Sequence, residues 1–203
     1  MAAGKSTVAQ LLAERLDRAV HLRGDTFRRA IVSGRHEMTA NPTQEALAQL
    51  RLRYELTAHA ANAYAAAGYT TIVQDTILGP LLEATVRLYS EPTHLVVLAP
   101  SVDAVVERER SRHKDGYTRI TPNDLDLLLR TETPRLGHWI DSSTQSPDET
   151  VDTIVDLLHL RAARTGSSQE GPPAADNNEL PGPRCVPSRG TGARAVRPGP
   201  SSR

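Results

Sequence analysis

The sequence predicts an α/β fold, a three-layer sandwich in which helices cover both faces of a mostly parallel β-sheet. Helix-like and strand-like segments alternate along the first 160 or so residues, which is the pattern of parallel strands connected by helices. The strand-like segments are short and rich in branched apolar residues, as in residues 94–99 (HLVVLA), and are therefore typical of strands buried on both faces. In such a sheet, a ligand site is expected at the carboxyl ends of the strands.

Composition separates this region from the C-terminus. Seven of the 14 prolines and six of the 13 glycines lie after Arg161, among Ser, Asn and Arg and with almost no large apolar residue. A segment of this kind cannot bury enough apolar surface to offset the entropy lost on folding. We therefore predict one domain over residues 1–161 and a disordered tail over residues 162–203.

In the first half of the domain, periodicity predicts three helices and two strands. Apolar residues at helical spacing begin the series, and the longest helix is rich in alanine and ends at Gly68. The segment after it, YTTIVQ, is β-branched and strand-like. The predicted elements are a helix over 5–18, a strand over 19–22, a helix over 26–33, a loop over 34–42, a helix over 43–67 and a strand over 69–74.

The second half repeats the alternation. Ser101 is expected to cap a helix, because a serine side chain can accept a bond from one of the first free amides of a helix. Pro, Asp and Glu open the last predicted helix and suit its first turn. The predicted elements are a helix over 80–90, a strand over 94–99, a helix over 102–112, a helix over 124–131, a strand over 138–141 and a helix over 147–160.

Charge and composition exclude several classes of function. The 24 Lys and Arg residues balance 24 Asp and Glu residues, so the total charge gives no basic footprint for a nucleic acid or an anionic membrane. The one cysteine, Cys185, excludes a disulfide framework. No apolar run approaches the roughly 20 residues that span a bilayer, and no signal peptide is recognisable, so we expect a cytoplasmic protein.

The most specific motif lies at the N-terminus. Residues 1–7 (MAAGKST) match the last part of the phosphate-loop pattern G-x-x-x-x-G-K-[ST] and run directly into the first predicted helix. In such a loop, backbone amides and the positive end of the helix dipole hold nucleotide phosphates. Lys5 is expected to reach the β- and γ-phosphate oxygens, and the Ser6 hydroxyl to bind Mg²⁺. The residues predicted to bind the nucleotide are Ala3, Gly4, Lys5, Ser6 and Thr7.

Two parts of this motif would fall ahead of Met1, namely its first glycine and the apolar strand that leads into the loop. Because that strand anchors a working phosphate loop, we expect that the true start of the protein lies upstream or that the gene is truncated. The first strand of the predicted sheet is then missing from residues 1–161. The alternative interpretation of the motif is a chance Gly-Lys-Ser-Thr at the start of a helix.

A second candidate position is Asp25, which follows the strand predicted over 19–22 and therefore lies at a carboxyl end, beside the loop. A carboxylate there can accept the proton of an attacking hydroxyl and direct it at the γ-phosphoryl group. Arg28, three residues on, can hold an anionic or polar part of the substrate. The alternative is that Asp25 caps a helix that starts at Thr26.

With this loop and this acid, residues 1–160 resemble the P-loop small-molecule kinases and phosphotransferases, whose nucleotide site is similar to that of AAA-family ATPases. The group contains chloramphenicol phosphotransferase, gluconate and adenylylsulfate kinases, zeta-type toxins and polynucleotide 5′-kinases. The resemblance implies a P-loop NTPase sandwich, ATP and Mg²⁺ as cofactors, and a D-x-x-R element that supplies the base and a substrate-binding arginine. Here these would be Asp25 and Arg28. The Gly-Lys-[ST] loop is specific for the superfamily, whereas D-x-x-R does not identify the substrate.

Three further groups of residues are weaker candidates. Asp75 ends a strand and could contact the Mg²⁺ water shell or a substrate hydroxyl, or cap a loop. Arg108 and Arg112 share one face of a predicted helix and resemble the lid whose arginines close over the transferred phosphoryl group, although a solvated charged helix would explain them too. Residues 142–147 resemble the loop near adenine, and turn chemistry explains them equally well.

Together these residues predict an ATP- and Mg²⁺-dependent phosphotransferase that transfers the γ-phosphoryl group to a hydroxyl of a small molecule, a metabolite or an antibiotic. Asp25 would be the base, Lys5 and the arginines of 108–112 would stabilise the transferred group, and Arg28 and Asp75 would bind the acceptor. Two alternatives stay open. A nucleic-acid 5′-hydroxyl kinase shares D-x-x-R but needs a basic channel, and a chain that starts at Met1 could be a non-catalytic remnant without its central strand.

Overall fold

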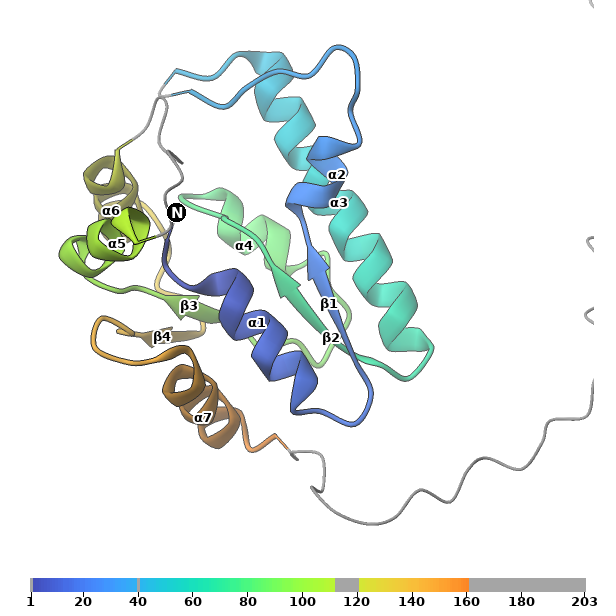
Figure 1. The fold of residues 1–203 in the computed structure, drawn as a ribbon. Coiled ribbons are helices and arrows are strands. Elements are labelled where there is room, and N and C mark those ends of the chain that lie inside the picture. Colours follow the sequence, from blue (N-terminus) through green and yellow to red (C-terminus); the bar gives the residue numbers. More distant parts are fainter. Residues whose placement is uncertain (1, 40, 112–120, 161–203) are drawn as a thin grey trace, which may run out of the picture. The chain divides into compact units, whose positions relative to one another are not determined.

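The computed structural model describes residues 2–39, 41–111 and 121–160. The chain divides into two units, Met1–Thr165 and Gly166–Arg203, and all described residues belong to the first. Helices and strands alternate along this unit (Figure 1), which confirms the predicted α/β class. The tail predicted over 162–203 lies outside the described residues, and its disorder stays a prediction. The elements are α1 (Lys5–Glu14), β1 (Ala19–Arg23), α2 (Asp25–Arg29), α3 (Gln44–Ala66), β2 (Thr70–Gln74), α4 (Leu81–Val86), β3 (Val96–Leu98), α5 (Val102–Arg110), α6 (Pro122–Thr131), β4 (His138–Ile140) and α7 (Pro147–Leu158).

Side-chain caps fix where several helices begin. Thr43 and Ser101 each accept a bond of 3.2 Å from the backbone amide three residues on, so α3 and α5 start where the sequence predicted. The predicted start of α6 at Asp124 is wrong, because Thr121 caps the helix and forms a reciprocal capping box with the Asp124 carboxylate. α6 therefore begins at Pro122.

Three helices end four residues earlier than the sequence predicted. α1 ends at Glu14, α2 at Arg29 and α4 at Val86, where the predictions ran to 18, 33 and 90. After each, the chain tightens into turns with bonds three residues apart: the Leu16 amide donates to the Ala13 carbonyl at 3.3 Å, the Ile31 amide to the Arg28 carbonyl at 3.2 Å and the Tyr89 amide to the Val86 carbonyl at 3.2 Å. Such tight turns commonly close an α-helix.

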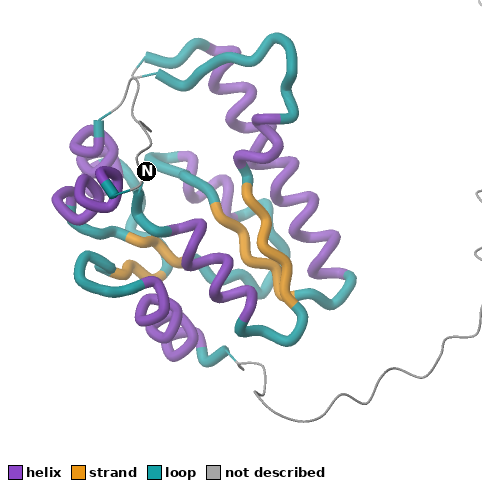
Figure 2. The backbone as a smooth tube through the Cα atoms, viewed as in Figure 1, coloured by secondary structure: helices purple, strands orange, loops and turns teal. Residues whose placement is uncertain are grey.

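The described strands form two separate two-stranded sheets, and both are parallel (Figure 2). β1 pairs with β2 from Ala19 opposite Thr70 to Arg23 opposite Gln74. β3 pairs with β4 from Val96 opposite His138 to Leu98 opposite Ile140. The parallel direction confirms the prediction, but within the described strands no ladder joins β2 to β3, so one continuous sheet is not formed.

The backbone directions show which edges lie open. The amide of Thr70 donates to the Arg18 carbonyl at 2.8 Å, and the amide of Gly24 donates to the Gln74 carbonyl at 3.1 Å, so even-numbered residues of β2 face β1. Because backbone groups alternate in direction along a parallel strand, those of Thr71 and Val73 face away from β1. By the same argument, the Ala99 amide bonded to the Ile140 carbonyl at 2.8 Å leaves the backbone groups of Val96 and Leu98 facing away from β4.

Helices α1 and α7 join the two sheets in a single core. The Ile72 side chain of β2 packs on the α1–α7 side, whereas the neighbouring Thr71 hydroxyl donates to the Ala61 carbonyl of α3 at 3.3 Å. α1 and α3 therefore cover opposite faces of the β1–β2 sheet, as the three-layer prediction requires (Figure 1). The buried cluster comprises Val8, Leu12, Ile140, Val151 and Ile154, with Ile72, Val96 and Leu98 packed against it.

None of the helices in the described part of the chain combines the length and the apolar character needed to cross a membrane.

Candidate active site

The predicted phosphate loop turns into α1 at Gly4. Gly4 has a φ of 87°, in the left-handed region that glycine adopts without strain, and its carbonyl accepts the Val8 amide at 3.0 Å. The helix starts at Lys5, as the motif predicts, and Ala2 ahead of it is fully buried. The first turn of α1 therefore presents its free backbone amides at the loop, which is the arrangement that binds anions.

The loop lies against the carboxyl end of β2. The Ser6 hydroxyl donates to Oε1 of Gln74, the last residue of that strand, at 2.9 Å. Sequence reasoning named Ser6 but missed Gln74. The signal was its place directly before Asp75 at a strand end, where a side chain on one face of the strand can reach the loop.

Asp75 is the most buried acid of the site. Its side chain is 5% exposed, Oδ1 accepts Nη2 of Arg53 at 2.5 Å and the Thr76 amide at 2.6 Å, and Oδ2 has no hydrogen-bond partner among the described residues. Burial raises the pKa of the Asp75 carboxyl above its usual value, although Arg53, the Thr76 amide and Lys5 act in the opposite direction. The charge of Asp25 also raises this pKa, so both Lys5 and Asp25 lie within electrostatic range of Asp75.

Gly24 allows the end of β1 to approach Asp75. A Cβ atom at Gly24 would lie 1.8 Å from Oδ2 of Asp75, so no residue with a side chain fits there unless Asp75 moves. Sequence reasoning missed this contact, because the two residues are far apart in the chain. The glycine directly before Asp25 is the one local sign of a close approach.

Asp25 begins α2 and lies at the carboxyl end of β1, as predicted. The N-cap residue is Gly24 and no side chain caps the helix, so the alternative in which Asp25 is the cap is wrong. Its carboxylate instead accepts Nε of Arg29 at 2.7 Å and lies 3.9 Å from Nη1 of Arg28. Arg28 also pairs with Glu37, so its charge is shared between two acids.

Helix α3 holds the acid at the end of β2, and sequence reasoning did not identify this role. Arg53 is 11% exposed, and the Tyr54 hydroxyl donates to the Thr76 carbonyl at 3.0 Å. The Arg53 guanidinium also lies 5.3 Å from the centre of the Tyr54 ring. One sequence signal could have identified Arg53: it is a charged residue on the buried face of the helix, four residues before the buried Thr57.

Arg108, one of the two predicted lid arginines, makes no contact with Asp25 in the described part of the chain. Nη2 of Arg108 donates to the carbonyls of Ser142, Ser143 and Gln145 at 2.5, 3.4 and 3.3 Å. Arg108 thus orders the loop after β4, which is the segment that resembles an adenine loop. Arg112 lies outside the described residues, and its role stays a prediction.

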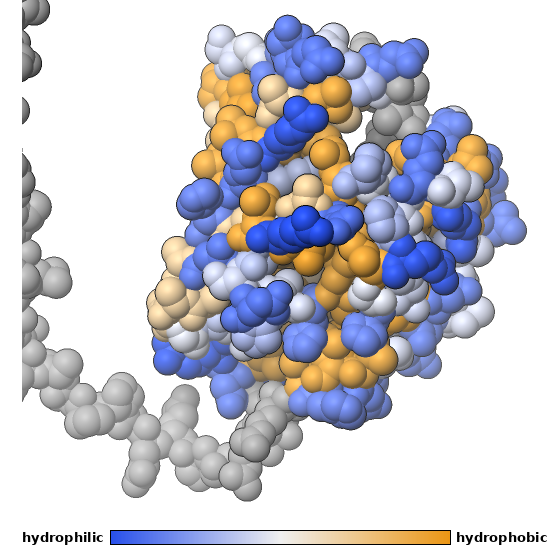
Figure 3. Space-filling view, turned by 180° about the vertical axis from the view of Figure 1, so that it is seen from behind, coloured by the Kyte–Doolittle hydropathy of each residue, from blue (hydrophilic) through white to orange (hydrophobic). Residues whose placement is uncertain are grey.

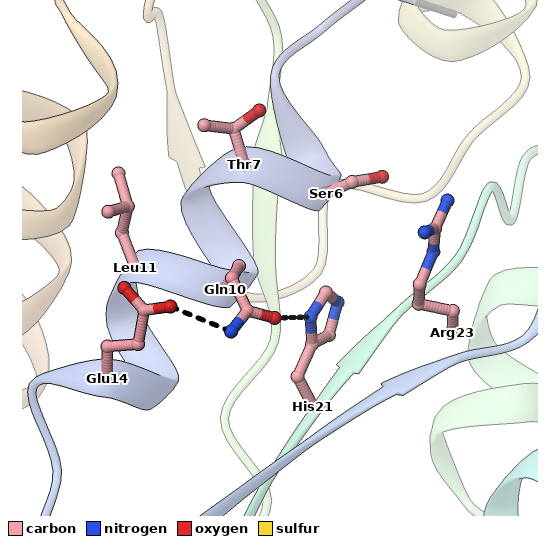
Figure 4. A pocket seen from close by; sticks show the side chains of 7 residues that line it. All are labelled: Ser6, Thr7, Gln10, Leu11, Glu14, His21 and Arg23. Carbon is pink, nitrogen blue, oxygen red and sulfur yellow. Dashed lines mark hydrogen bonds between the residues drawn. The ribbon is translucent and has the colours of Figure 1, made fainter.

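A cavity of about 370 Å³ lies beside the phosphate loop, between α1 and β1 (Figure 4). Its polar wall is a chain of side chains in which His21 Nδ1 lies 2.9 Å from Gln10 Oε1, and Gln10 Nε2 donates to Glu14 at 2.9 Å. Burial, and to a lesser degree the charge of Arg23, lowers the pKa of His21. Ser6 and Arg23 lie at the loop end of this cavity (Figure 4). Among the described residues, no three His, Cys, Asp or Glu side chains are grouped as metal ligands.

Residues 1–133 match the model of a protein family described as an AAA domain, and the chain belongs to this family. No curated protein matches the chain.

Several solved structures share the fold at low sequence identity. An unliganded sugar kinase from Janibacter sp. HTCC2649 is 17% identical, with a TM-score of 0.57 over 78% of this chain and 89% of that chain. The adenylylsulfate (APS) kinase of Mycobacterium tuberculosis, in complex with AMPPNP and APS, is 17% identical, with a TM-score of 0.57 over 78% and 92%. The tunicamycin resistance protein of Deinococcus radiodurans is 19% identical, with a TM-score of 0.53 over 79% and 92%. The predicted resemblance to the P-loop kinase group and the predicted fold class are confirmed.

Proposed function

We propose that this protein is an ATP- and Mg²⁺-dependent cytoplasmic phosphotransferase that transfers the γ-phosphoryl group to a hydroxyl of a small molecule. The observation that carries the proposal is the place of Asp25 and Asp75 just after the carboxyl ends of two paired parallel strands, with the phosphate loop held against the second strand by the bond from Ser6 to Gln74. A phosphate loop and a strand-end acid in one site are the parts that phosphoryl transfer to an alcohol needs.

The residues around the loop fit a nucleotide and its metal ion. The amides of Ala3, Gly4, Lys5, Ser6 and Thr7 would hold the phosphates, with the Lys5 ammonium at the β- and γ-oxygens. The Ser6 hydroxyl would bind Mg²⁺, and Asp75, directly after the last residue of β2, would contact a water of its shell. The ion would neutralise charge on the phosphates when it is bound.

Asp25 would take the proton of the acceptor hydroxyl at its Oδ1, since Oδ2 already accepts Arg29. Arg28 and Asp75 would position the acceptor. Arg108, which orders the loop after β4, would stabilise negative charge on the transferred phosphoryl group together with Arg112.

The test is Asp25→Asn. Phosphoryl transfer, measured as ADP release with a panel of alcohols, should fall by about 100-fold or more, while nucleotide affinity stays within about twofold. Asp126→Asn is the matched control, because Asp126 forms the same kind of exposed pair with Arg130, four residues on, at 2.9 Å. Loss of nucleotide binding in Asp25→Asn, or an equal loss of transfer in the control, would count against a base at Asp25.

The open edges of β2 and β3 favour a second candidate, a nucleotide-binding domain without catalysis, because no described strand pairs with either edge beside the phosphate loop. Nucleotide affinity of the chain as printed separates the two candidates when it is compared with that of a chain lengthened ahead of Met1 by an apolar strand and a glycine. Equal, weak affinity in both would support the domain without catalysis. Affinity that rises with the added strand would support the kinase.

A further inference from the structure

Arg23 ends β1 at the carboxyl end of the sheet, where the phosphate loop lies. Its register partner is Gln74, the last residue of β2, whose side chain accepts the Ser6 hydroxyl at 2.9 Å. Arg23 also lines the cavity between α1 and β1 together with Ser6 and Thr7 of the loop (Figure 4). Side chains of alternate residues lie on the same face of a strand, so Arg23 and His21 both face α1. A positive charge is therefore placed beside the two hydroxyls of the loop.

The guanidinium of Arg23 pairs with no acid among the described residues. The other arginines around Asp25 and Asp75 each pair with an acid, namely Arg28, Arg29 and Arg53. Burial lowers the pKa of His21, and the charge of Arg23 adds to this effect, so that charge acts within the cavity. Arg23 thus keeps its charge for an anion that enters from outside the chain, whereas the other three arginines are already compensated.

Exposure alone does not distinguish Arg23. Figure 3 shows hydrophilic residues scattered over the face opposite to that of Figure 1, as on most proteins. Arg51 of α3 is likewise exposed and without an acid partner in the described part of the chain, but it does not line the cavity at the loop. The difference between Arg23 and Arg51 is therefore the place of Arg23 beside Ser6, at the end of a strand that leads to Asp25.

The γ-phosphoryl group of ATP is the anion that fits this place. In the proposed function, the Ser6 hydroxyl binds the metal ion that bridges the β- and γ-phosphates, and Asp25 holds the acceptor hydroxyl. The group that is transferred must lie between these two points, because it moves from the nucleotide to the acceptor. Arg23 is two residues before Asp25 and shares a cavity with Ser6, so it is next to both.

We propose, resting on the proposed function, that Arg23 binds the γ-phosphoryl group of ATP and stabilises its charge during transfer. In this transfer, the bond from the γ-phosphorus to the bridging oxygen of ADP breaks, the acceptor oxygen forms a bond to the phosphorus, and the hydroxyl proton goes to Asp25. Arg23 forms no covalent bond. Its planar guanidinium donates N–H groups to oxygens of the phosphoryl group and acts in addition to Lys5.

The first test is the calorimetric affinity of the full chain for ATP and for ADP, each with Mg²⁺. Arg23→Gln should weaken ATP binding about tenfold or more and leave ADP binding within about twofold, because ADP lacks the group that Arg23 contacts. Arg23→Lys should recover part of the loss, since it keeps the charge without the planar fork. The matched control, Arg51→Gln, should leave both affinities unchanged.

Three results of this test would overturn the proposal: an ATP affinity that Arg23→Gln does not change, an equal loss for ATP and ADP, or the same loss in Arg51→Gln. An unaltered chain that binds neither nucleotide would overturn it together with the proposed function. The melting temperature of Arg23→Gln should be unchanged, because the side chain has no bonded partner among the described residues, so a lower affinity would not reflect unfolding.

Phosphoryl transfer, measured as ADP release with a panel of alcohols, distinguishes failure of this inference from failure of the proposed function. Arg23→Gln should lower kcat about 100-fold or more. A selective loss of ATP affinity in Arg23→Gln, without ADP release from any alcohol in the unaltered chain, would keep the phosphate contact and reject the phosphotransferase. ADP release that Arg23→Gln leaves unchanged, with unchanged ATP affinity, would keep the phosphotransferase and reject the role of Arg23.

Discussion

The two halves of the described domain use a buried or partly buried arginine in opposite ways. In the half built on β1 and β2, Arg53 of α3 lies against the carboxylate of Asp75, and the two side chains are 11% and 5% exposed. In the half built on β3 and β4, Arg108 of α5 binds backbone carbonyls of the loop after β4, and no described carboxylate pairs with it.

This difference decides which charge is available to a ligand. A carboxylate cancels the charge of a guanidinium, whereas carbonyl oxygens solvate the guanidinium and leave its charge in place. The Arg53–Asp75 pair is therefore nearly neutral to a phosphate, and Arg108 remains positive beside residues 142–145. Two arginines that a motif search counts alike thus differ in their electrostatic role because of their partners.

The largest expected effect is at Arg53. Arg53→Met leaves the Asp75 carboxylate buried without its counter-ion and should lower the free energy of unfolding by about 3–5 kcal/mol, measured by urea denaturation. The exposed pair between Arg87 and Glu83 is the control, since Arg87→Met should cost about 0–1 kcal/mol. The double variant Arg53→Met with Asp75→Asn should recover most of the loss, because the buried charge is then removed as well. Similar losses in Arg53→Met and Arg87→Met would mean that burial does not make the Arg53–Asp75 pair more important than the exposed pair.

The next effect is at Arg108, on the other side of the comparison. In Arg108→Lys the shorter side chain does not bring its ammonium to the position of Nη2, which contacts all three carbonyls, so the change should cost about 1–3 kcal/mol in the same measurement. Arg110→Lys is the neighbouring control, because Arg110 is exposed and pairs with Glu107 at 3.6 Å. A loss confined to Arg110→Lys would refute the structural role of Arg108.

A similar or smaller effect, about 1–3 kcal/mol, is expected from Gly24→Ala, whose new Cβ atom would displace the Asp75 carboxylate. The double variant Gly24→Ala with Asp75→Ala removes the atoms that clash. The two changes should therefore cost less together than the sum of their separate effects in a double-mutant cycle. Strict additivity would show that the close approach is unimportant.

The smallest effect is a pH dependence in the β1–β2 half. Burial lowers the folded-state pKa of His21, so the unfolded chain takes up a proton first as the pH falls. This contribution to stability is fully present above about pH 6.5 and is lost as the pH falls from there through the folded-state pKa. His21→Gln should therefore show a smaller drop in melting temperature between pH 7.5 and pH 5.5 than the unaltered chain, and an unchanged drop would exclude His21 as its source.

Local signals predicted the element order and the parallel direction well. Apolar periodicity located α1 and α3, and short-range caps such as Ser101 and Ser146 fixed where helices begin. The ends of α1, α2 and α4 were missed, because tight terminal turns carry no clear residue signature. The positions of Gly4 at the start of α1 and of Asp25 just after β1 were predicted correctly, because each belongs to a short pattern at a helix or strand end.

The rest of the site depends on contacts between distant segments. Arg53 and Asp75 are 22 residues apart, and Ser6 and Gln74 are 68 apart, so a single sequence does not show that they meet. The same holds for Arg108, whose carbonyl partners lie 34 to 37 residues further on. Pairings of this kind follow from tertiary packing, which overrides what each residue suggests locally.

The open edges of β2 and β3 also affect how the chain behaves at high concentration. The alternate backbone groups of Thr71, Val73, Val96 and Leu98 form two rows of donors and acceptors that any extended peptide can bind. A strand from a neighbouring molecule can pair with either row, so self-association should increase with protein concentration. Light scattering of the chain as printed, beside the chain lengthened by an apolar strand, would report this as particle growth in the first sample and a monodisperse second sample.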